Sequence, residues 1–254
     1  MEHRAAWVTG GIAGLGVMVA KQLAENGYHI AVNYRTSQDQ AEQLGREIRK
    51  TGRQYLALQG DVADPQAVKG MVQEMEQTWG GVDILVCAAG PFLFQRIKTV
   101  NLTDEQWREM VDGNLSGVFY CVREVVPMMR KQGWGRIITF GFPEVENAPH
   151  WEGFSAYAAA KAGLVSFTRT LAKEEAPFGI TVNMVCPGDI RHPYKEAPIE
   201  KARGKRDSKN PVGRPGTGED LARVIQFLVN PDSDFITGGV IPVTGGFDNN
   251  SFRV

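Results

Sequence analysis

Short apolar runs alternate with longer amphipathic segments along all 254 residues, and this alternation limits the folds that the chain can adopt. The runs are nearly continuously apolar, which is typical of parallel strands that are covered on both faces. The pattern predicts an α/β fold, with one doubly wound parallel sheet of about seven strands and helices on both of its faces. The expected strands are Ala5–Thr9, His29–Asn33, Gln54–Leu58, Ile84–Cys87, Arg136–Phe140, Thr181–Val185 and Val240–Val243.

The segments between the strands have the spacing of amphipathic helices. Asp64 is an N-cap residue type and is followed by Pro65, which suits the first helical position, so we expect a helix to begin there. No linker, repeat or low-complexity segment divides the sequence, so we expect a single domain over residues 1–254. The expected helices include Asp39–Lys50, Gln66–Trp79, Asp104–Arg130 and Ser155–Ala176.

Residues 191–218 interrupt this alternation with four prolines and a run of basic side chains. They follow an expected strand end, which is where ligands bind in sheets of this type. We interpret the stretch as a mobile substrate flap, because compact domains seldom keep long irregular insertions without a use. A solvated surface excursion is the alternative interpretation.

The composition argues against several other classes of function. A net charge of −1 gives no field for nucleic acid. No stretch approaches the roughly 20 apolar residues of a membrane span. The three cysteines lack CxxC spacing, so we expect buried reduced thiols and no metal site. The first expected strand begins at Ala5, which leaves no room for a signal peptide, and we expect a cytoplasmic protein.

A glycine-rich run from Thr9 to Gly16 follows the first expected strand and opens a helix. Gly10 permits a tight turn, Gly14 lets phosphates approach the backbone, and Gly16 lets the helix pack closely. The free N–H groups and the dipole at the helix N-terminus favour a pyrophosphate. The run therefore predicts a Rossmann-type turn that binds a dinucleotide.

The end of the second expected strand bears on the choice of cofactor. A carboxylate expected there would bind the ribose of NAD. This chain instead has Tyr34 at that position, followed by Arg35 and two hydroxyl side chains. Arg35 can bind a 2′-phosphate in bidentate fashion, so we expect NADP(H) to be favoured over NAD(H). An arginine that is simply solvated is the alternative.

Tyr157 and Lys161 lie four residues apart on an expected helix, so their side chains share one face. A nearby ammonium favours the ionised form of a phenol. Such a pair can exchange a proton with a carbonyl or alcohol oxygen.

Together these features resemble the short-chain dehydrogenase/reductase family. Asp61-Val62, Asn114 in Gly113-Asn114-Leu115, and Pro187-Gly188-Asp189-Ile190 resemble the family's adenine-contacting, active-site and nicotinamide-contacting segments. The last third of the chain, including Asn210-Pro211-Val212-Gly213-Arg214, resembles β-ketoacyl-carrier-protein reductases. The resemblance implies cofactor contacts at Thr9, Gly10, Gly14, Leu15, Gly16, Arg35, Asp61, Val62, Gly90, Tyr157, Lys161, Pro187, Gly188 and Ile190.

The resemblance also implies roles for three residues. Tyr157 would be the acid/base, Lys161 would bind the nicotinamide ribose and lower the pKa of Tyr157, and Asn114 would complete the proton relay. The expected activity is hydride transfer between NADP(H) and a small-molecule carbonyl or alcohol, possibly a 3-oxoacyl thioester. The family pairs its subunits through two long helices, so we expect a homotetramer.

The chain departs from the family at one catalytic position. The family's serine at the end of the fifth strand is replaced by Phe142, and the loop to Tyr157 is longer. We expect Ser155 to cap the following helix, and the longer loop to supply any substitute group. The candidates in that loop are Glu144, Glu146, Asn147 and His150.

Two other functions stay open on these residues. Loss of the serine favours a dinucleotide-binding protein with little turnover, which would act as a sensor or bind a partner. A non-redox enzyme on the same scaffold, such as an epimerase or dehydratase, is the other alternative. Aromatic residues in two loops, namely Phe92, Phe94, Phe142 and Trp151, together with Pro91 predict an apolar or aromatic pocket, although loops packing on themselves would give the same composition.

Overall fold

The computed structural model describes residues 4–247, which form a seven-stranded sheet flanked by helices. All neighbouring strands are parallel, and their order is β3-β2-β1-β4-β5-β6-β7. This confirms the predicted doubly wound α/β fold. The strands are β1 (Ala5–Thr9), β2 (His29–Tyr34), β3 (Tyr55–Gln59), β4 (Ile84–Cys87), β5 (Gly135–Phe140), β6 (Ile180–Pro187) and β7 (Val240–Val243).

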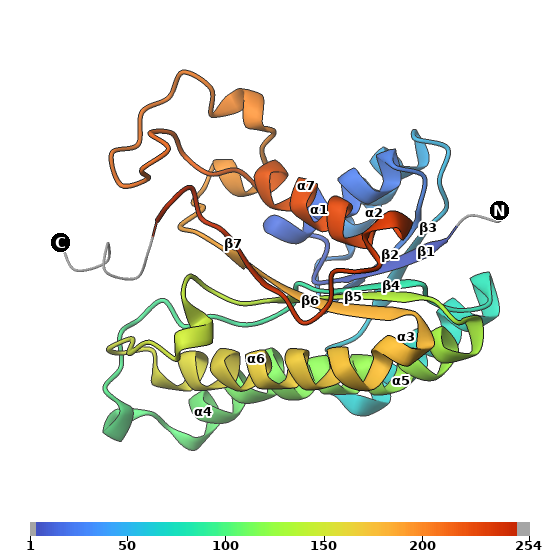
Figure 1. The fold of residues 1–254 in the computed structure, drawn as a ribbon, viewed down its shortest axis with the longest axis horizontal. Helices are drawn as coiled ribbons and strands as arrows, with labels where there is room; N and C mark the ends of the chain where they lie inside the picture. The colour runs from blue at the N-terminus through green and yellow to red at the C-terminus, as the bar shows by residue number, and fades with distance from the viewer. Residues whose placement is uncertain (1–3, 248–254) are drawn as a thin grey trace.

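Helices cover both faces of the sheet (Figure 1). One face carries α1 (Leu15–Glu25), α2 (Gln38–Arg49) and α7 (Gly218–Val229), and the other carries α3 (Pro65–Trp79), α4 (Asp104–Val111), α5 (Gly117–Gln132) and α6 (Ser155–Glu175). Successive β1 residues enter the two different cores, because Ala6 and Val8 pack with α1 and α7 whereas Trp7 packs with α3, α5 and α6. The sheet is therefore buried on both sides, which explains its continuous apolar strands.

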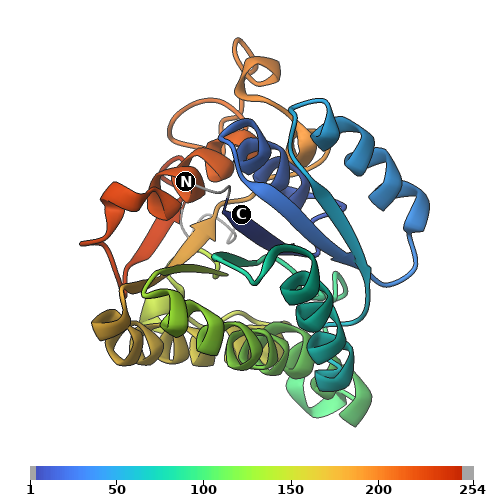
Figure 2. The ribbon, with the colours of Figure 1, turned by 90° about the vertical axis from the view of Figure 1, so that its right-hand side faces the viewer.

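The strand order reverses between β1 and β4 (Figure 2). From β1 the chain moves outward to β2 and β3, and then returns to β4 on the other side of β1. The connections after β1 and β4 consequently separate to opposite faces. Ligands in open α/β sheets bind in the crevice at this point, beyond the carboxyl ends of the strands.

The expected helix Asp104–Arg130 is interrupted in the structure. Between α4 and α5 lies a five-residue π-helical turn, η2 (Asp112–Ser116). The turn packs closely on the ends of other elements, since a Cβ on Gly113 would collide with Pro91 and one on Gly117 would lie 3.0 Å from the Val62 carbonyl oxygen. The prediction of one continuous helix was wrong, because a π turn changes the hydrogen-bond register and needs no distinctive residue type.

Residues 191–217 lead from β6 to α7 and include two short 3₁₀ helices, η5 (Tyr194–Glu196) and η6 (Ile199–Lys201). This segment lies beside α1 and α7 and then projects outward, as the orange trace in Figure 1 shows. Ala197 and Ala202 are fully buried, so the segment is anchored at these residues. Other short helices are η1 (Thr99–Asn101), η3 (Val145–Asn147), η4 (Ala176–Phe178) and η7 (Pro231–Ser233).

None of the helices within residues 4–247 combines the length and the apolar character that crossing a membrane requires.

Candidate active site

The turn after β1 is held in place by side chains from neighbouring strands. Gly10 has φ +61°, a left-handed conformation that favours glycine. Its N–H donates to Asn33 Oδ1 at 3.1 Å, and Asn33 Nδ2 donates to the Gly60 carbonyl at 3.1 Å. Thr9 Oγ1 accepts from the Ala89 N–H at 3.0 Å, so this hydroxyl links β1 to the end of β4. Buried Asn33 and Thr9 thus fix the turn between the strand ends.

The N-terminus of α1 is open to an anion. Its N-cap, Gly14, has φ +63° and no side chain to cap the helix, and a Cβ placed there would meet no atom within 4 Å. Gly16 packs against the turn, because its Cβ would lie 2.9 Å from the Gly10 carbonyl oxygen. The Gly14 N–H donates to the carboxylate Oε1 of Glu196 at 2.7 Å. That carboxylate is an anion at the position where a phosphate would accept the same hydrogen bond.

A groove extends from this turn across the ends of β1, β2 and β4. Arg35 contributes to its wall, and its Nη1 lies 3.4 Å from Asp61 Oδ2. The Arg35 side chain is 68% exposed and that of Asp61 42%, so this ion pair adds little stability and leaves the guanidinium accessible. The groove is lined by Gly10, Ile12, Ala13, Asn33, Tyr34, Arg35, Thr36, Ser37, Asp61, Val62, Ala88, Ala89, Gly90, Pro91 and Gly113.

Tyr157 and Lys161 lie on successive turns of α6, as their spacing predicts. Lys161 Nζ is 5.7 Å from the centroid of the Tyr157 ring. Aromatic side chains pack around that ring, with centroid distances of 4.9 Å to Phe92, 6.0 Å to Trp151 and 6.1 Å to Phe142. The expected aromatic environment is therefore present around Tyr157.

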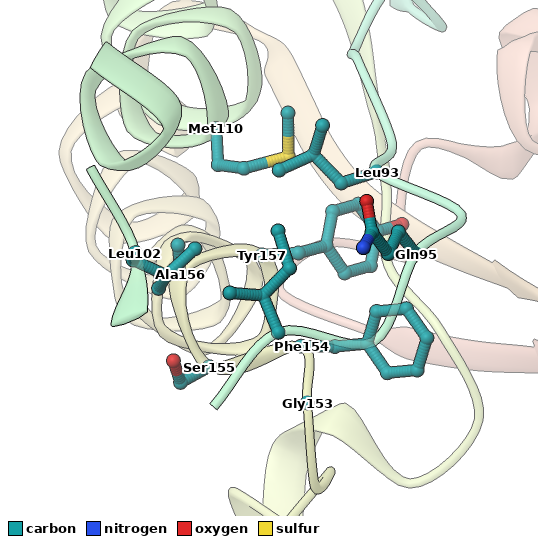
Figure 3. Close-up of a pocket in the computed structure, with 10 residues that line it drawn as sticks. Leu93, Gln95, Leu102, Met110, Gly153, Phe154, Ser155, Ala156 and Tyr157 are labelled. Atoms are coloured by element: carbon teal, nitrogen blue, oxygen red, sulfur yellow. The ribbon is translucent and has the colours of Figure 1, made fainter. Parts of the chain in front are cut away.

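A small pocket beside Tyr157 lies between α4, the start of α6 and the loop after β4 (Figure 3). Its wall is mostly apolar, with Leu93 and Met110 on one side. Gln95 lines the same pocket as Tyr157, and its amide makes no side-chain hydrogen bond within residues 4–247 (Figure 3). Gln95 therefore brings an uncommitted donor and acceptor to this wall.

Asn114 lies in the π turn and faces Lys161. Its Nδ2 donates to the carbonyls of Pro91 at 2.9 Å and Met110 at 3.0 Å, which fixes the amide. Its Oδ1 is buried and accepts no hydrogen bond from the described residues. A Cβ on Gly90 would contact this oxygen and would lie 3.8 Å from Lys161 Nζ. Asn114, Gly90 and Lys161 thus meet where the groove reaches α6.

Burial controls the protonation of both α6 groups. It lowers the pKa of Lys161 to about 8, and the Cys87 and Cys186 thiols oppose this change only weakly. Burial also raises the pKa of Tyr157, and the nearby Cys186 thiol raises it further by a smaller amount. The resemblance implied that Lys161 lowers the Tyr157 pKa, but in this structure desolvation dominates and the phenol stays protonated at neutral pH.

The predicted site residues fall into three groups. Gly10, Arg35, Asp61, Val62 and Gly90 line the groove, and Gly90 adjoins Asn114 and Lys161, with Tyr157 one turn before Lys161 on α6. Thr9, Gly14, Leu15 and Gly16 belong to the turn and to the first residues of α1 behind it, with Gly14 as the N-cap. Pro187 ends β6, while Gly188 and Ile190 line a separate hollow with residues 210–216 and the end of β7.

The region of the missing serine differs from two expectations. Phe142 is buried and packs on Trp151 at 5.1 Å, so it is part of the core beside Tyr157. The longer loop contains positive φ angles at Glu144 and Ala148. Ser155 does not cap α6, whose N-cap is Phe154. Its hydroxyl oxygen instead accepts from Thr99 Oγ1 at 3.0 Å, because the loop after β4 reaches the start of α6.

The longer loop brings no substitute group to the Tyr157 pocket. Among the described residues that line this pocket, none of the four candidates Glu144, Glu146, Asn147 and His150 is present. Glu146 lines a different hollow along α6.

Gln95 was missed because its loop has no regular pattern. Asn33 offered a signal, since a polar residue in an apolar strand is costly to bury without a structural role.

The groove fits a dinucleotide on three observations of this chain. The α1 N-terminus already binds a carboxylate and Gly14 leaves space for a phosphate. At the far end the Asn114 oxygen, which has no hydrogen-bond partner among residues 4–247, lies beside a buried cation, Lys161. A hydrogen-bond acceptor and a cation in this arrangement suit the hydroxyls and water that accompany a ribose.

Comparisons with known proteins agree with this geometry. The family model described as Enoyl-(Acyl carrier protein) reductase matches residues 11–248. YtkK, an inferred oxidoreductase of Bacillus subtilis (strain 168), is 45% identical over 98% of this chain and 97% of its own. The 3-oxoacyl-[acyl-carrier-protein] reductase FabG of Staphylococcus epidermidis is 37% identical over 96% of this chain and 98% of its own.

A solved structure from Bacillus thuringiensis, of an inferred 3-oxoacyl-reductase, superposes with a TM-score of 0.90 at 44% identity, covering 97% of this chain and 98% of the other. The chain belongs to the short-chain dehydrogenase/reductase family, a family of oxidoreductases that use a nicotinamide dinucleotide.

Proposed function

We propose that this protein is an NADP(H)-dependent oxidoreductase that interconverts a carbonyl group and an alcohol. The observation that carries the proposal is the convergence of Tyr157, Lys161 and Asn114 at the end of a dinucleotide-sized groove. The family membership supports oxidoreductase chemistry, and these side chains supply the site that a fold by itself does not. When bound, the nicotinamide gives or takes the hydride.

The groove supports NADP(H) over NAD(H). Arg35 stands in its wall beside Thr36 and Ser37, and Tyr34 replaces the carboxylate that would bind a free 2′-hydroxyl. The neighbouring Asp61 holds the guanidinium at the groove without burying it. A 2′-phosphate would meet a charged bidentate donor and two hydroxyl groups there.

Tyr157 is suited to donating a proton. Because burial raises its pKa, the phenol carries its proton at neutral pH and can deliver it to the oxygen of a carbonyl that accepts hydride. Lys161 is a cation at the same end of the groove, where it stabilises negative charge on the phenol oxygen once the proton has left. The Asn114 oxygen can accept a hydrogen bond from a water next to Lys161, and that water would be the source from which the proton is replaced.

The missing serine changes how the substrate oxygen is held. We assign this hydrogen bond to the Gln95 amide, an uncommitted polar group on the wall of the pocket that Tyr157 also lines. The remaining wall is apolar and aromatic, which favours a substrate with an apolar chain or ring next to its carbonyl. A 3-oxoacyl thioester meets this requirement, and the similarity to a 3-oxoacyl-carrier-protein reductase supports it.

The surrounding chain supports three further proposals. Residues 191–218 act as the substrate flap of a single domain that spans residues 1–254. Exposed aromatic side chains on α4, α5 and α7, namely Trp107, Phe119 and Phe227, favour assembly into a homotetramer, which light scattering at micromolar concentration tests. The buried free cysteines suit the reducing cytoplasm.

The test is NADPH oxidation with a panel of carbonyl compounds that includes acetoacetyl-CoA. We expect turnover by the wild type, and loss of the chemical step in Tyr157→Phe with NADPH affinity almost unchanged. NADPH binding without turnover on any compound would favour the dinucleotide-binding protein, a reading that Phe142 in place of the serine supports. Undiminished turnover by Tyr157→Phe would exclude the proposed mechanism.

A further inference from the structure

Within residues 4–247, Glu196 is the one residue of the 191–218 segment whose side chain hydrogen-bonds the glycine-rich turn. Its carboxylate Oε1 accepts from the Gly14 N–H at 2.7 Å, and the two residues are 182 positions apart. The first turn of α1 contains no acidic residue. The anion at this helix N-terminus therefore comes from a segment that is distant in the sequence.

The backbone around Glu196 is held close to α1 by other contacts. Gly218, at the start of α7, lies directly against the Lys195 carbonyl and beside Met18 of α1, where any Cβ would collide. The Ile199 N–H donates to Glu219 Oε2 at 2.6 Å, and the intervening Ala197 is fully buried. The Glu196 side chain is therefore delivered to the turn by an anchored backbone.

The same N–H group is needed by a dinucleotide. The pyrophosphate of a cofactor bound in this groove would lie at the N-terminus of the first helix, where the helix dipole favours an anionic group. A carboxylate and a phosphate at one N–H would compete for its hydrogen bond and repel each other. Cofactor binding must then remove the Glu196 carboxylate from Gly14.

We propose that Glu196 sets the affinity for the dinucleotide, by occupying the phosphate position until the cofactor displaces it. Displacement also breaks a contact that ties the 191–218 segment to α1. The presence of cofactor is thereby transmitted to the segment that follows β6. The inference rests on the proposed binding of NADP(H), and it adds a determinant of affinity that lies outside the glycine-rich sequence.

The test compares Glu196→Gln with the wild type by calorimetric titration of NADPH. Glutamine keeps the size of the side chain and removes its charge. The matched control is Glu200→Gln, an exposed carboxylate of the same segment that pairs with Arg203 at 3.3 Å. Adenosine 2′-monophosphate is a second probe, because it carries the 2′-phosphate and lacks the pyrophosphate.

We expect Glu196→Gln to bind NADPH about two- to fivefold more tightly, the fold-change that corresponds to about 0.3–1 kcal/mol for an exposed anion at a helix N-terminus. Adenosine 2′-monophosphate should bind both proteins equally, and Glu200→Gln should match the wild type with both probes. Added salt should reduce the difference, because the carboxylate is exposed.

Equal or weaker binding of NADPH by Glu196→Gln would overturn the inference, and weaker binding would make Glu196 part of the cofactor site. An equal gain in NADPH affinity in Glu200→Gln, or a gain in the affinity of Glu196→Gln for adenosine 2′-monophosphate, would also overturn it. Either result would mean that loss of a negative charge has a general effect on binding. If neither wild type nor Glu196→Gln binds NADPH, the proposed function fails and this inference fails with it.

Limited trypsin digestion gives a readout that does not depend on affinity. NADPH should accelerate cleavage at the lysines and arginines of residues 195–209 in the wild type, because the Gly14 contact is released. Cleavage of Glu196→Gln should be faster without cofactor and should change little on adding NADPH. An equal response of both proteins to NADPH would contradict the coupling.

Discussion

Replacing Lys161 by methionine should stabilise the folded protein at neutral pH. Burial lowers the Lys161 pKa from 10.5 to about 8, and the nearest titrating groups are thiols whose own pKa values burial raises to about 12. No anion therefore compensates this cation among the described residues around it. A fall from 10.5 to about 8 corresponds to about 3 kcal/mol of destabilisation in the charged form, at about 1.36 kcal/mol per pH unit.

The sign of the pH dependence follows from the two pKa values. Between pH 8 and 10.5 the unfolded chain holds the Lys161 proton while the folded chain releases it, so stability rises with pH across this window. Below pH 8 both states are protonated and the full destabilisation is present. Methionine fills a similar volume without charge, so the free energy of unfolding should increase by up to about 3 kcal/mol at pH 7 and by much less near pH 10.

Urea denaturation of wild type and Lys161→Met at pH 7 and pH 10 measures this difference. The matched control is Lys173→Met, because Lys173 lies on the same helix and is exposed. Its midpoint should change little at either pH. A lower midpoint for Lys161→Met at pH 7 would refute the reasoning, since it would mean that a partner compensates the charge. The variant should lose turnover, which would make Lys161 a case of stability given up for function.

Three other variants test the site. Phe142→Ser should lower the free energy of unfolding, measured in urea, by about 3–5 kcal/mol without restoring turnover. The control Phe235→Ser, at an exposed position, should change neither quantity. A large gain in turnover by Phe142→Ser would mean that the lost serine limits the rate. Gln95→Ala should lower kcat about 10-fold to 10²-fold. This is at or below the usual effect of removing an oxyanion donor, because Gln95 is exposed. An unchanged kcat would exclude Gln95 as the group that holds the substrate oxygen. Arg35→Ala should weaken NADPH binding by about 10-fold or more while leaving NADH binding unchanged, and equal titrations of NADPH and NADH by the wild type would contradict the cofactor preference.

The strands could be predicted closely because their burial on both faces leaves a strong local signal. Every expected strand is present, and those at Ala5–Thr9, Ile84–Cys87 and Val240–Val243 have the predicted bounds. The start of α3 was also encoded locally, since Asp64 Oδ1 accepts from the Gln66 N–H at 2.8 Å as a cap should. Such features depend only on neighbours in the sequence.

The features that were missed depend on contacts between distant segments. Ser155 has a cap-forming residue type, yet its hydroxyl bonds Thr99 because the loop after β4 folds back onto α6. The spacing of Tyr157 and Lys161 predicted a shared helix face. It could not predict that burial would outweigh their mutual charge effect, because the surrounding wall comes from other loops. The contact between Gly14 and Glu196 has no local signal at all.

The π turn that carries Asn114 allows the active site to change in evolution while the fold stays the same. A π turn holds one residue more than the α-helix it interrupts, and the helices α4 and α5 on either side keep their own packing. Deleting one codon within Asp112–Ser116 would therefore close a regular helix and remove Asn114 from Lys161 with the sheet intact. The same deletion in the middle of α6 would rotate everything after it by about 100° and break the core. The asparagine thus occupies a position that a single insertion can create and a single deletion can erase.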